Sequence, residues 1–240
     1  MKKQKQFNVQ RLYSKRSGVY KFAQDKRSEA SDGVYFFDPE KKYHKGDAFV
    51  IPNMASFIHD VSEHGNIGAL KKRVFKLNPF QLLRLAWWNK KNILSIAKKE
   101  FHAGVLMLIQ IELLQIQKYK PSMVIVSDQV NDLSYSLNNK QILIGAQMLV
   151  KDKLNLPFAV MTNNLAVAVQ KLADWNLKPK YIFTPFNRFG YEMNPDQTTV
   201  EFAAALVDPS RIVAITPELK QEDKAYLEKH GIENGMVNWF

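Results

Sequence analysis

Residues 181–190 read YIFTPFNRFG, and the expected fold follows from this stretch. An apolar start, a Thr-Pro break and a polar tip at Asn187 and Arg188 are typical of a buried strand that ends in a turn. Residues 211–219, RIVAITPEL, repeat this pattern with Glu218 at the tip. We therefore predict two neighbouring strands whose ends carry polar side chains.

Apolar runs of the same kind lie on either side of these two strands. They read MVIV at 123–126, FAVM at 158–161 and MVNW at 236–239, and segments with helical spacing separate them. Almost wholly apolar strands that alternate with helices favour a parallel sheet covered on both faces. The sequence thus predicts an α/β fold, for which we prefer a TIM-barrel-like arrangement to an open doubly wound sheet.

The first half of the chain is organised differently. Residues 1–32 hold nine basic and three acidic residues, which predicts a basic, partly disordered arm before a single α/β domain at 33–240. Two strands are expected at 34–37 and 48–51, and then a helix that ends at residues 64–66. The long helical tract at 69–120 interrupts the strand-helix alternation, so it is expected to be an insertion.

The positive charge of the chain is also confined to its first half. The net charge is +11, but residues 121–240 carry 11 Lys and Arg against 13 Asp and Glu, whereas residues 1–120 carry 23 against 10. Such asymmetry favours an anionic partner for the first half, either nucleic acid or an acidic membrane surface. A well-solvated basic surface without a partner is the alternative.

The most basic part of that half is residues 71–99, which hold nine basic residues and no acidic one. Lys and Arg neutralise phosphates and aromatic rings stack on bases, so this tract is the candidate for nucleic-acid contact. A helix with Trp and Leu on one side and Lys on the other would equally suit an anionic membrane. A third interpretation is a helix with buried aromatic rings and solvated lysines. The candidate contact residues are Lys71, Lys72, Arg73, Trp87 and Trp88.

Catalytic candidates come from the predicted strand ends, because the loops there converge on one face of the sheet. Asp128 and Glu218 could supply acid-base catalysis, and Arg188 could bind a phosphate or carboxylate. Asn164 and Asn187 could orient the substrate. The alternative is that these side chains only cap helices and shape turns, although Arg188 has no capping role.

Several classes of function lack the residues that they need. There is no cysteine, no glycine-rich phosphate loop, no G-x-S-x-G and no H-E-x-x-H. His59 and His64 are five residues apart, which does not align them on one face of a helix, so we predict no metal site. The sequence does not indicate which cofactor, if any, the protein uses. The longest apolar run, 104–116, contains Gln110, Glu112 and Gln115 and is shorter than the roughly 20 residues of a membrane span. The basic start has no apolar segment behind it, so a cytoplasmic protein without a transmembrane segment is expected.

Two functions remain. The first is an enzyme that acts on an anionic small molecule, phosphorylated or carboxylated, at the strand carboxyl ends. The second is a protein that binds nucleic acid or an anionic membrane surface through its basic first half.

Overall fold

The protein is described by a computed structural model over residues 8–14, 34–38, 41–90, 101–217 and 220–239. Within these ranges eight strands form one sheet with the order β1-β8-β7-β6-β5-β4-β3-β2. The strands are β1 (Asn8–Ser14), β2 (Val34–Phe36), β3 (Ala48–Ile51), β4 (Met123–Val126), β5 (Phe158–Met161), β6 (Ile182–Pro185), β7 (Ile212–Thr216) and β8 (Asn234–Trp239).

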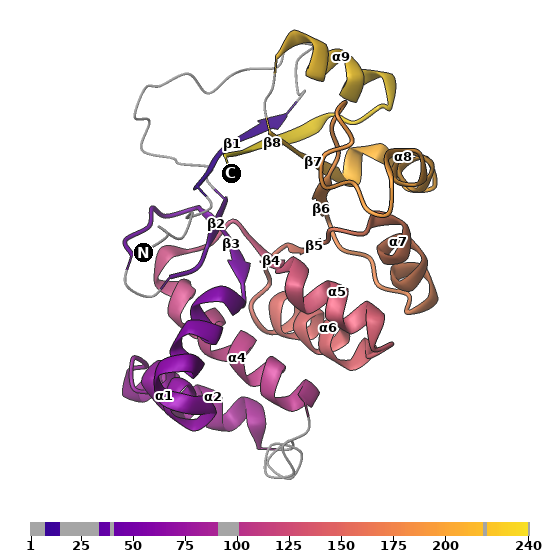
Figure 1. Cartoon of the computed structure of the whole chain (residues 1–240). Coiled ribbons are helices and arrows are strands. Elements are labelled where there is room, and N and C mark those ends of the chain that lie inside the picture. The colour runs from indigo at the N-terminus through magenta and orange to yellow at the C-terminus, as the bar shows by residue number, and fades with distance from the viewer. Residues whose placement is uncertain (1–7, 15–33, 39–40, 91–100, 218–219, 240) are drawn as a thin grey trace.

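Strands β2 to β8 are parallel and lie beside one another in the order in which they occur in the chain. In the centre, Val124 and Val126 of β4 align with Phe158 and Val160 of β5. The predicted α/β fold with a parallel sheet is therefore confirmed. Figure 1 shows the strands following a curve, with the helices along its outer side.

The consecutive order is that of a barrel, and the reversal of a doubly wound sheet does not occur among the described strands. Closure of a barrel is not confirmed. Strand β1 pairs antiparallel with β8, and β1 and β2 form the two edges of the described sheet. The sheet is thus a curled half-barrel.

Strand β1 falls inside the predicted basic arm. Of residues 1–32 only 8–14 are described, and the remainder of the predicted arm lies outside the described residues. The sequence did not predict this strand.

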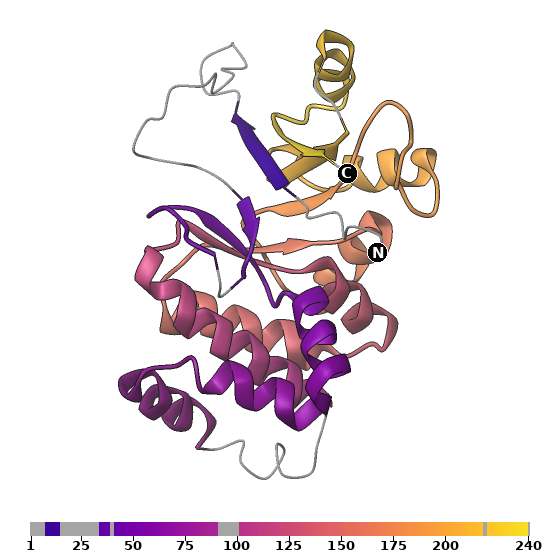
Figure 2. The same ribbon diagram turned by 60° about the vertical axis from the view of Figure 1, so that its left-hand side comes forward.

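Helices follow most of the strands and cover the outer face of the sheet (Figures 1 and 2). The second half contains α5 (Asp128–Ser136), α6 (Lys140–Gln147), the π-helix η2 (Met148–Lys153), α7 (Leu165–Asp174), α8 (Gln197–Ala205), the 3-10 helix η3 (Pro209–Arg211) and α9 (Gln221–Lys229). The sequence predicted one helix over 141–152, where the structure has α6 and η2.

The insertion lies between β3 and β4. It contains α1 (Met54–Val74), α2 (Pro79–Asn89), α4 (Phe101–Ile116) and the 3-10 helix η1 (Gln117–Tyr119). The expected helix end at residues 64–66 is instead a kink, since Gly65 has φ 68° and ψ 170° and the helix resumes after it. Glycine tolerates this positive φ because it has no Cβ. Asn78 caps α2 and Pro79 begins it, as the sequence predicted.

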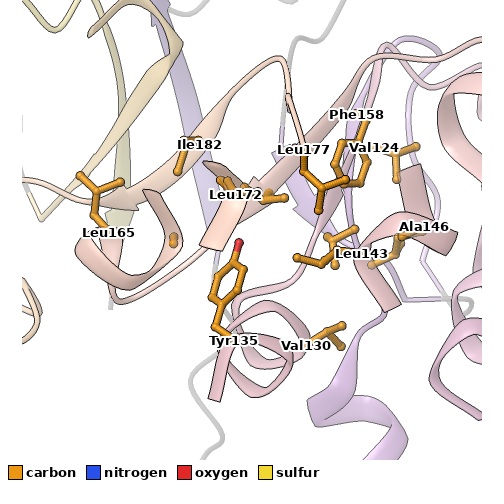
Figure 3. Close-up of a cluster of buried hydrophobic side chains, with 14 of the residues drawn as sticks. Val124, Val130, Tyr135, Leu143, Ala146, Phe158, Leu165, Leu172, Leu177 and Ile182 are labelled. Carbon is orange, nitrogen blue, oxygen red and sulfur yellow. The ribbon is translucent and has the colours of Figure 1, made fainter. Parts of the chain in front are cut away.

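The sheet is buried on both faces. Its outer face packs against the helices in one large cluster, in which Val124 of β4 and Phe158 of β5 meet Leu143 of α6 and Leu172 of α7 (Figure 3). Alternate strand residues, such as Ile125 and Phe183, pack with one another on the inner face. Since successive side chains of a strand point to opposite faces, two-sided burial explains why the strands are apolar at nearly every position.

Candidate functional site

Two carboxylates meet at the carboxyl ends of β4 and β5. Asp128 and Asp132 are one turn apart on α5, and Asn163 follows β5. The Nδ2 of Asn163 donates to Oδ2 of Asp128 at 2.8 Å, and its backbone N–H donates to Oδ2 of Asp132 at 3.0 Å. The hydroxyl of Thr162 donates to the other oxygen of Asp132. One asparagine therefore fixes both carboxylates.

The surroundings of these carboxylates are negatively charged. Burial raises the pKa of Asp132, the hydrogen bonds from Thr162 and Asn163 lower it in part, and the charge of Asp128 raises it further. The carboxyl of Glu192, in the loop after β6, is partly desolvated, which raises its pKa, and the charge of Asp128 adds to this effect. A raised pKa favours the protonated form of a carboxyl, which is the form that a general acid needs. The same surplus of negative charge disfavours an anionic ligand at this point.

The two asparagines predicted to orient a substrate stabilise the backbone. Asn164 caps α7, because its Oδ1 accepts the N–H of Val167 at 3.1 Å. Asn187 is buried, its Oδ1 accepts the N–H groups of Phe189 and Tyr191, and its Nδ2 donates to the carbonyl of Tyr191 at 2.8 Å. Asn187 therefore fixes the loop after β6.

Arg188 points to the start of α9. Its Nε donates to Oδ1 of Asp223 at 2.7 Å, and its guanidinium lies 2.9 Å from Oε2 of Glu222. Asp223 is buried and also accepts the N–H of Lys220. The positive charge of Arg188 is thus matched by two carboxylates. Glu218, the other predicted acid-base residue, lies outside the described residues.

Of the predicted site residues, Asp128 lies beside Asp132 and Asn163, whereas Arg188 is paired with residues of α9. Asp132 was not singled out from the sequence, although its spacing of four from Asp128 places both carboxylates on one face of a helix. Among the described residues, no group of three His, Cys, Asp or Glu side chains could hold a metal ion.

The basic tract divides into a buried and an exposed part. Arg73, near the end of α1, is only 2% exposed. Its guanidinium contacts Glu112 of α4 at 2.5 Å, Asp60 of α1 at 3.2 Å and the hydroxyl of Ser56 at 3.0 Å. Lys72 also binds Asp60, at 2.7 Å. Arg73, predicted as a surface contact, is an internal ion-pair residue that links both halves of kinked α1 to α4.

Helix α2 exposes a row of large apolar side chains. Phe80, Leu83 and Trp87 are 85%, 71% and 66% exposed, and Phe75, just before the helix, is 81% exposed. We call these four residues the α2 surface. Trp88, predicted together with Trp87, instead faces inward and packs against the core.

Exposed basic residues lie before, within and just after α2. Lys71, Lys76, Arg84 and Lys90 are exposed. The Nζ of Lys90 lies 3.7 Å from the centre of the Trp87 ring, a cation–π contact. Figures 1 and 2 both show α2 at the lower edge of the molecule.

Comparisons of the chain with families of proteins, with curated sequences and with solved structures found no match. None of the described helices is long and apolar enough to span a bilayer.

Proposed function

We propose that the protein binds anionic membrane surfaces through the α2 surface, with the α/β sheet as its scaffold. The observation that carries this proposal is the exposure of Phe75, Phe80, Leu83 and Trp87 beside basic side chains. Contiguous exposed apolar side chains rimmed by polar ones mark interaction sites. The anionic inner leaflet is the surface that a cytoplasmic protein would meet.

The exposed row is additional to the contacts that hold α2 in place. Phe80, Leu83 and Trp87 have helical spacing of three and four, so they share one side of α2. On the other side Leu85 is buried with Leu114 of α4. Polar contacts fasten the helix further, from Gln81 to the carbonyl of Leu114, from Arg84 to Gln117 and from Asn89 to Gln110. The helix therefore needs no partner for its own packing.

The charge of this region suits an anionic surface. No acidic residue occurs between Lys71 and Lys99. Each Lys or Arg near an anionic bilayer contributes on the order of 1 kcal/mol. Apolar insertion and electrostatic attraction would act together, as in other helices that lie in the membrane interface.

A lipid surface fits this row better than nucleic acid does. Phe80 and Trp87 could stack on bases, but Leu83 lies between them on the same side of the helix and offers no flat ring. An aliphatic side chain gains free energy when it enters the acyl boundary. Nucleic acid is therefore an outcome of the test and not the proposal.

The test is flotation of the protein with vesicles of phosphatidylcholine, with and without phosphatidylglycerol. We expect binding to the anionic vesicles and weaker binding in high salt. In Phe80→Ser/Trp87→Ser the loss of two inserted side chains should weaken binding by about 2–3 kcal/mol, or roughly 30- to 150-fold.

The matched control is Phe202→Ser. Phe202 is 68% exposed, but it lies on α8, far from α2 in Figure 1, and its change should leave binding unaltered. An equal loss in both variants would contradict a specific role of α2. Salt-sensitive binding to single-stranded RNA without any binding to vesicles would favour nucleic acid as the partner.

Acid-base catalysis at the strand ends is a second candidate function, favoured by the pair Asp128 and Asp132 around Asn163. Groups whose surroundings raise their pKa, as for Asp132, occur often in active sites. The pairing of Arg188 with Glu222 and Asp223 gives little support to an anionic substrate. A thermal-shift screen of small molecules would test this function. A ligand that stabilises the wild type but not Asp128→Asn would support it, and a ligand unaffected by that change would not.

A further inference from the structure

We propose that binding to an anionic membrane is coupled to the uptake of a proton by the carboxylate of Glu112. This inference rests on the proposed function of the α2 surface. It names a second residue, inside the protein, that would make membrane affinity depend on pH.

Glu112 is a buried carboxylate on α4, and only part of its lost hydration is replaced by hydrogen bonds. It is fully buried on α4 and accepts two hydrogen bonds, from Arg73 at 2.5 Å and from the backbone N–H of Asn53 at 3.0 Å. An ionised carboxylate has about four acceptor positions, so these two bonds replace only part of the lost hydration. The single guanidinium of Arg73 is also shared with Asp60.

Ionised Glu112 belongs to a cluster of ion pairs. Lys72 and Arg73 then face Asp60 and Glu112, so that two positive and two negative charges meet. Protonation of Glu112 removes one of these negative charges, so the net charge of the cluster rises by one. Arg73 lies two residues and Lys72 three residues before Phe75 in the chain, so this charge arises close to the α2 surface.

The other charged groups near Glu112 do not cancel this change. Asp38, after β2, adds negative charge, and the ring of Tyr43 lies close enough to be affected by Glu112. Strand β3 has no charged residue, α6 has only the exposed Lys140, and the exposed Arg84 of α2 contacts Gln117. Desolvation alone would raise the pKa of Asp60, but the hydrogen bonds and charges of Lys72 and Arg73 lower it overall, so Asp60 does not take up the proton in place of Glu112.

Burial raises the pKa of Glu112 to about 7, because the Arg73 charge and the Asn53 N–H only partly offset the lost hydration. Glu112 would then change its charge close to neutral pH. An anionic bilayer favours the protonated, more positive form, and by linkage the protonated form binds the bilayer more tightly. One added positive charge should tighten binding about two- to fivefold.

The experiment measures the affinity for phosphatidylglycerol vesicles at pH 6 and pH 8. We expect the His59→Gln/His64→Gln protein to bind more tightly at pH 6 than at pH 8, and the same protein with Glu112→Gln added to bind almost equally at both pH values. This background removes the two exposed imidazoles of α1 from the comparison. The variant His59→Gln/His64→Gln should keep the part of the pH dependence that Glu112 causes.

An equal pH 6 to pH 8 ratio in the His59→Gln/His64→Gln protein with and without Glu112→Gln would overturn the inference and leave the proposed function intact. Absence of vesicle binding at both pH values would refute the proposed function itself. A second measurement does not depend on the folding of Glu112→Gln. The His59→Gln/His64→Gln protein should take up a fraction of a proton when it binds vesicles at pH 7 in weak buffer, and no uptake would refute the coupling.

Discussion

Replacement of Arg73 by Met tests the buried ion pair directly. Methionine keeps much of the length of the side chain but removes its charge, so Glu112 loses its partner at 2.5 Å while it stays fully buried. Asp60 keeps its contact with Lys72, and Glu112 keeps the N–H of Asn53. Removal of one partner from a buried ion pair costs about 3–5 kcal/mol.

This cost should depend on pH. The pKa of Glu112 is about 7 in the folded protein and near its ordinary value of 4.5 in the unfolded chain. Between these values the folded state binds more protons, so the free energy of unfolding falls as pH rises through this window. Without Arg73 the pKa rises further. We therefore expect Arg73→Met to cost about 3–5 kcal/mol at pH 8 and only about 1 kcal/mol at pH 5, where Glu112 is already neutral.

Urea denaturation followed by far-UV circular dichroism at both pH values measures this difference. The double variant Arg73→Met/Glu112→Leu should recover most of the loss at pH 8, because no buried charge is left unpaired. A cost of Arg73→Met below about 1 kcal/mol at pH 8, or one that is equal at pH 5, would show that the pair is not buried as described.

Four further substitutions have distinct expected outcomes. Phe80→Ser should change the free energy of unfolding by less than about 0.5 kcal/mol, whereas Leu85→Ala, on the buried side of the same helix, should cost about 2–5 kcal/mol by urea denaturation. Gly145→Ala should change the free energy of unfolding by less than about 1 kcal/mol, because the new Cβ would lie 2.7 Å from Cδ2 of Leu106, the end of a flexible side chain that can turn away, and Ala has the better helix propensity; a loss above about 2 kcal/mol would contradict this. Asn163→Ala should cost about 1 kcal/mol, since it removes the side-chain hydrogen bond to Asp128 but keeps the backbone N–H that binds Asp132, and it should raise the rate of hydrogen exchange at the start of α5.

The strands of the second half could be predicted because their signal is local. Residues 123–126 and 158–161 are uninterrupted apolar runs between turn residues, and the structure places β4 and β5 on these positions. The kink at Gly65 was wrongly predicted as a helix end, because a glycine signals a break but not whether packing resumes the helix beyond it. Strand β1 has its partner in β8 at the other end of the chain, and no local pattern specifies such a pairing.

The side-chain roles were harder to predict for the same reason. Arg73 looks like one of several basic surface residues until Glu112, 39 positions away, is brought against it. Arg188 likewise meets Asp223 at a separation of 35 positions. Helix α2 carries apolar residues on both its exposed and its buried side, so the sequence does not distinguish the two sides. Trp87 and Trp88 were therefore predicted together, although only Trp87 is exposed.

The consecutive strand order has a consequence for how the chain folds. Each of β3 to β8 can add to a strand that precedes it in the chain, so the sheet can grow in the order of synthesis. Strand β1 is the exception, because β8, its partner, is made last. Of the described strands, β1 is made first, and it must wait for its partner until the growing sheet is nearly complete. Docking of β1 would therefore be a late folding step, and among the described strand pairs it closes the longest loop.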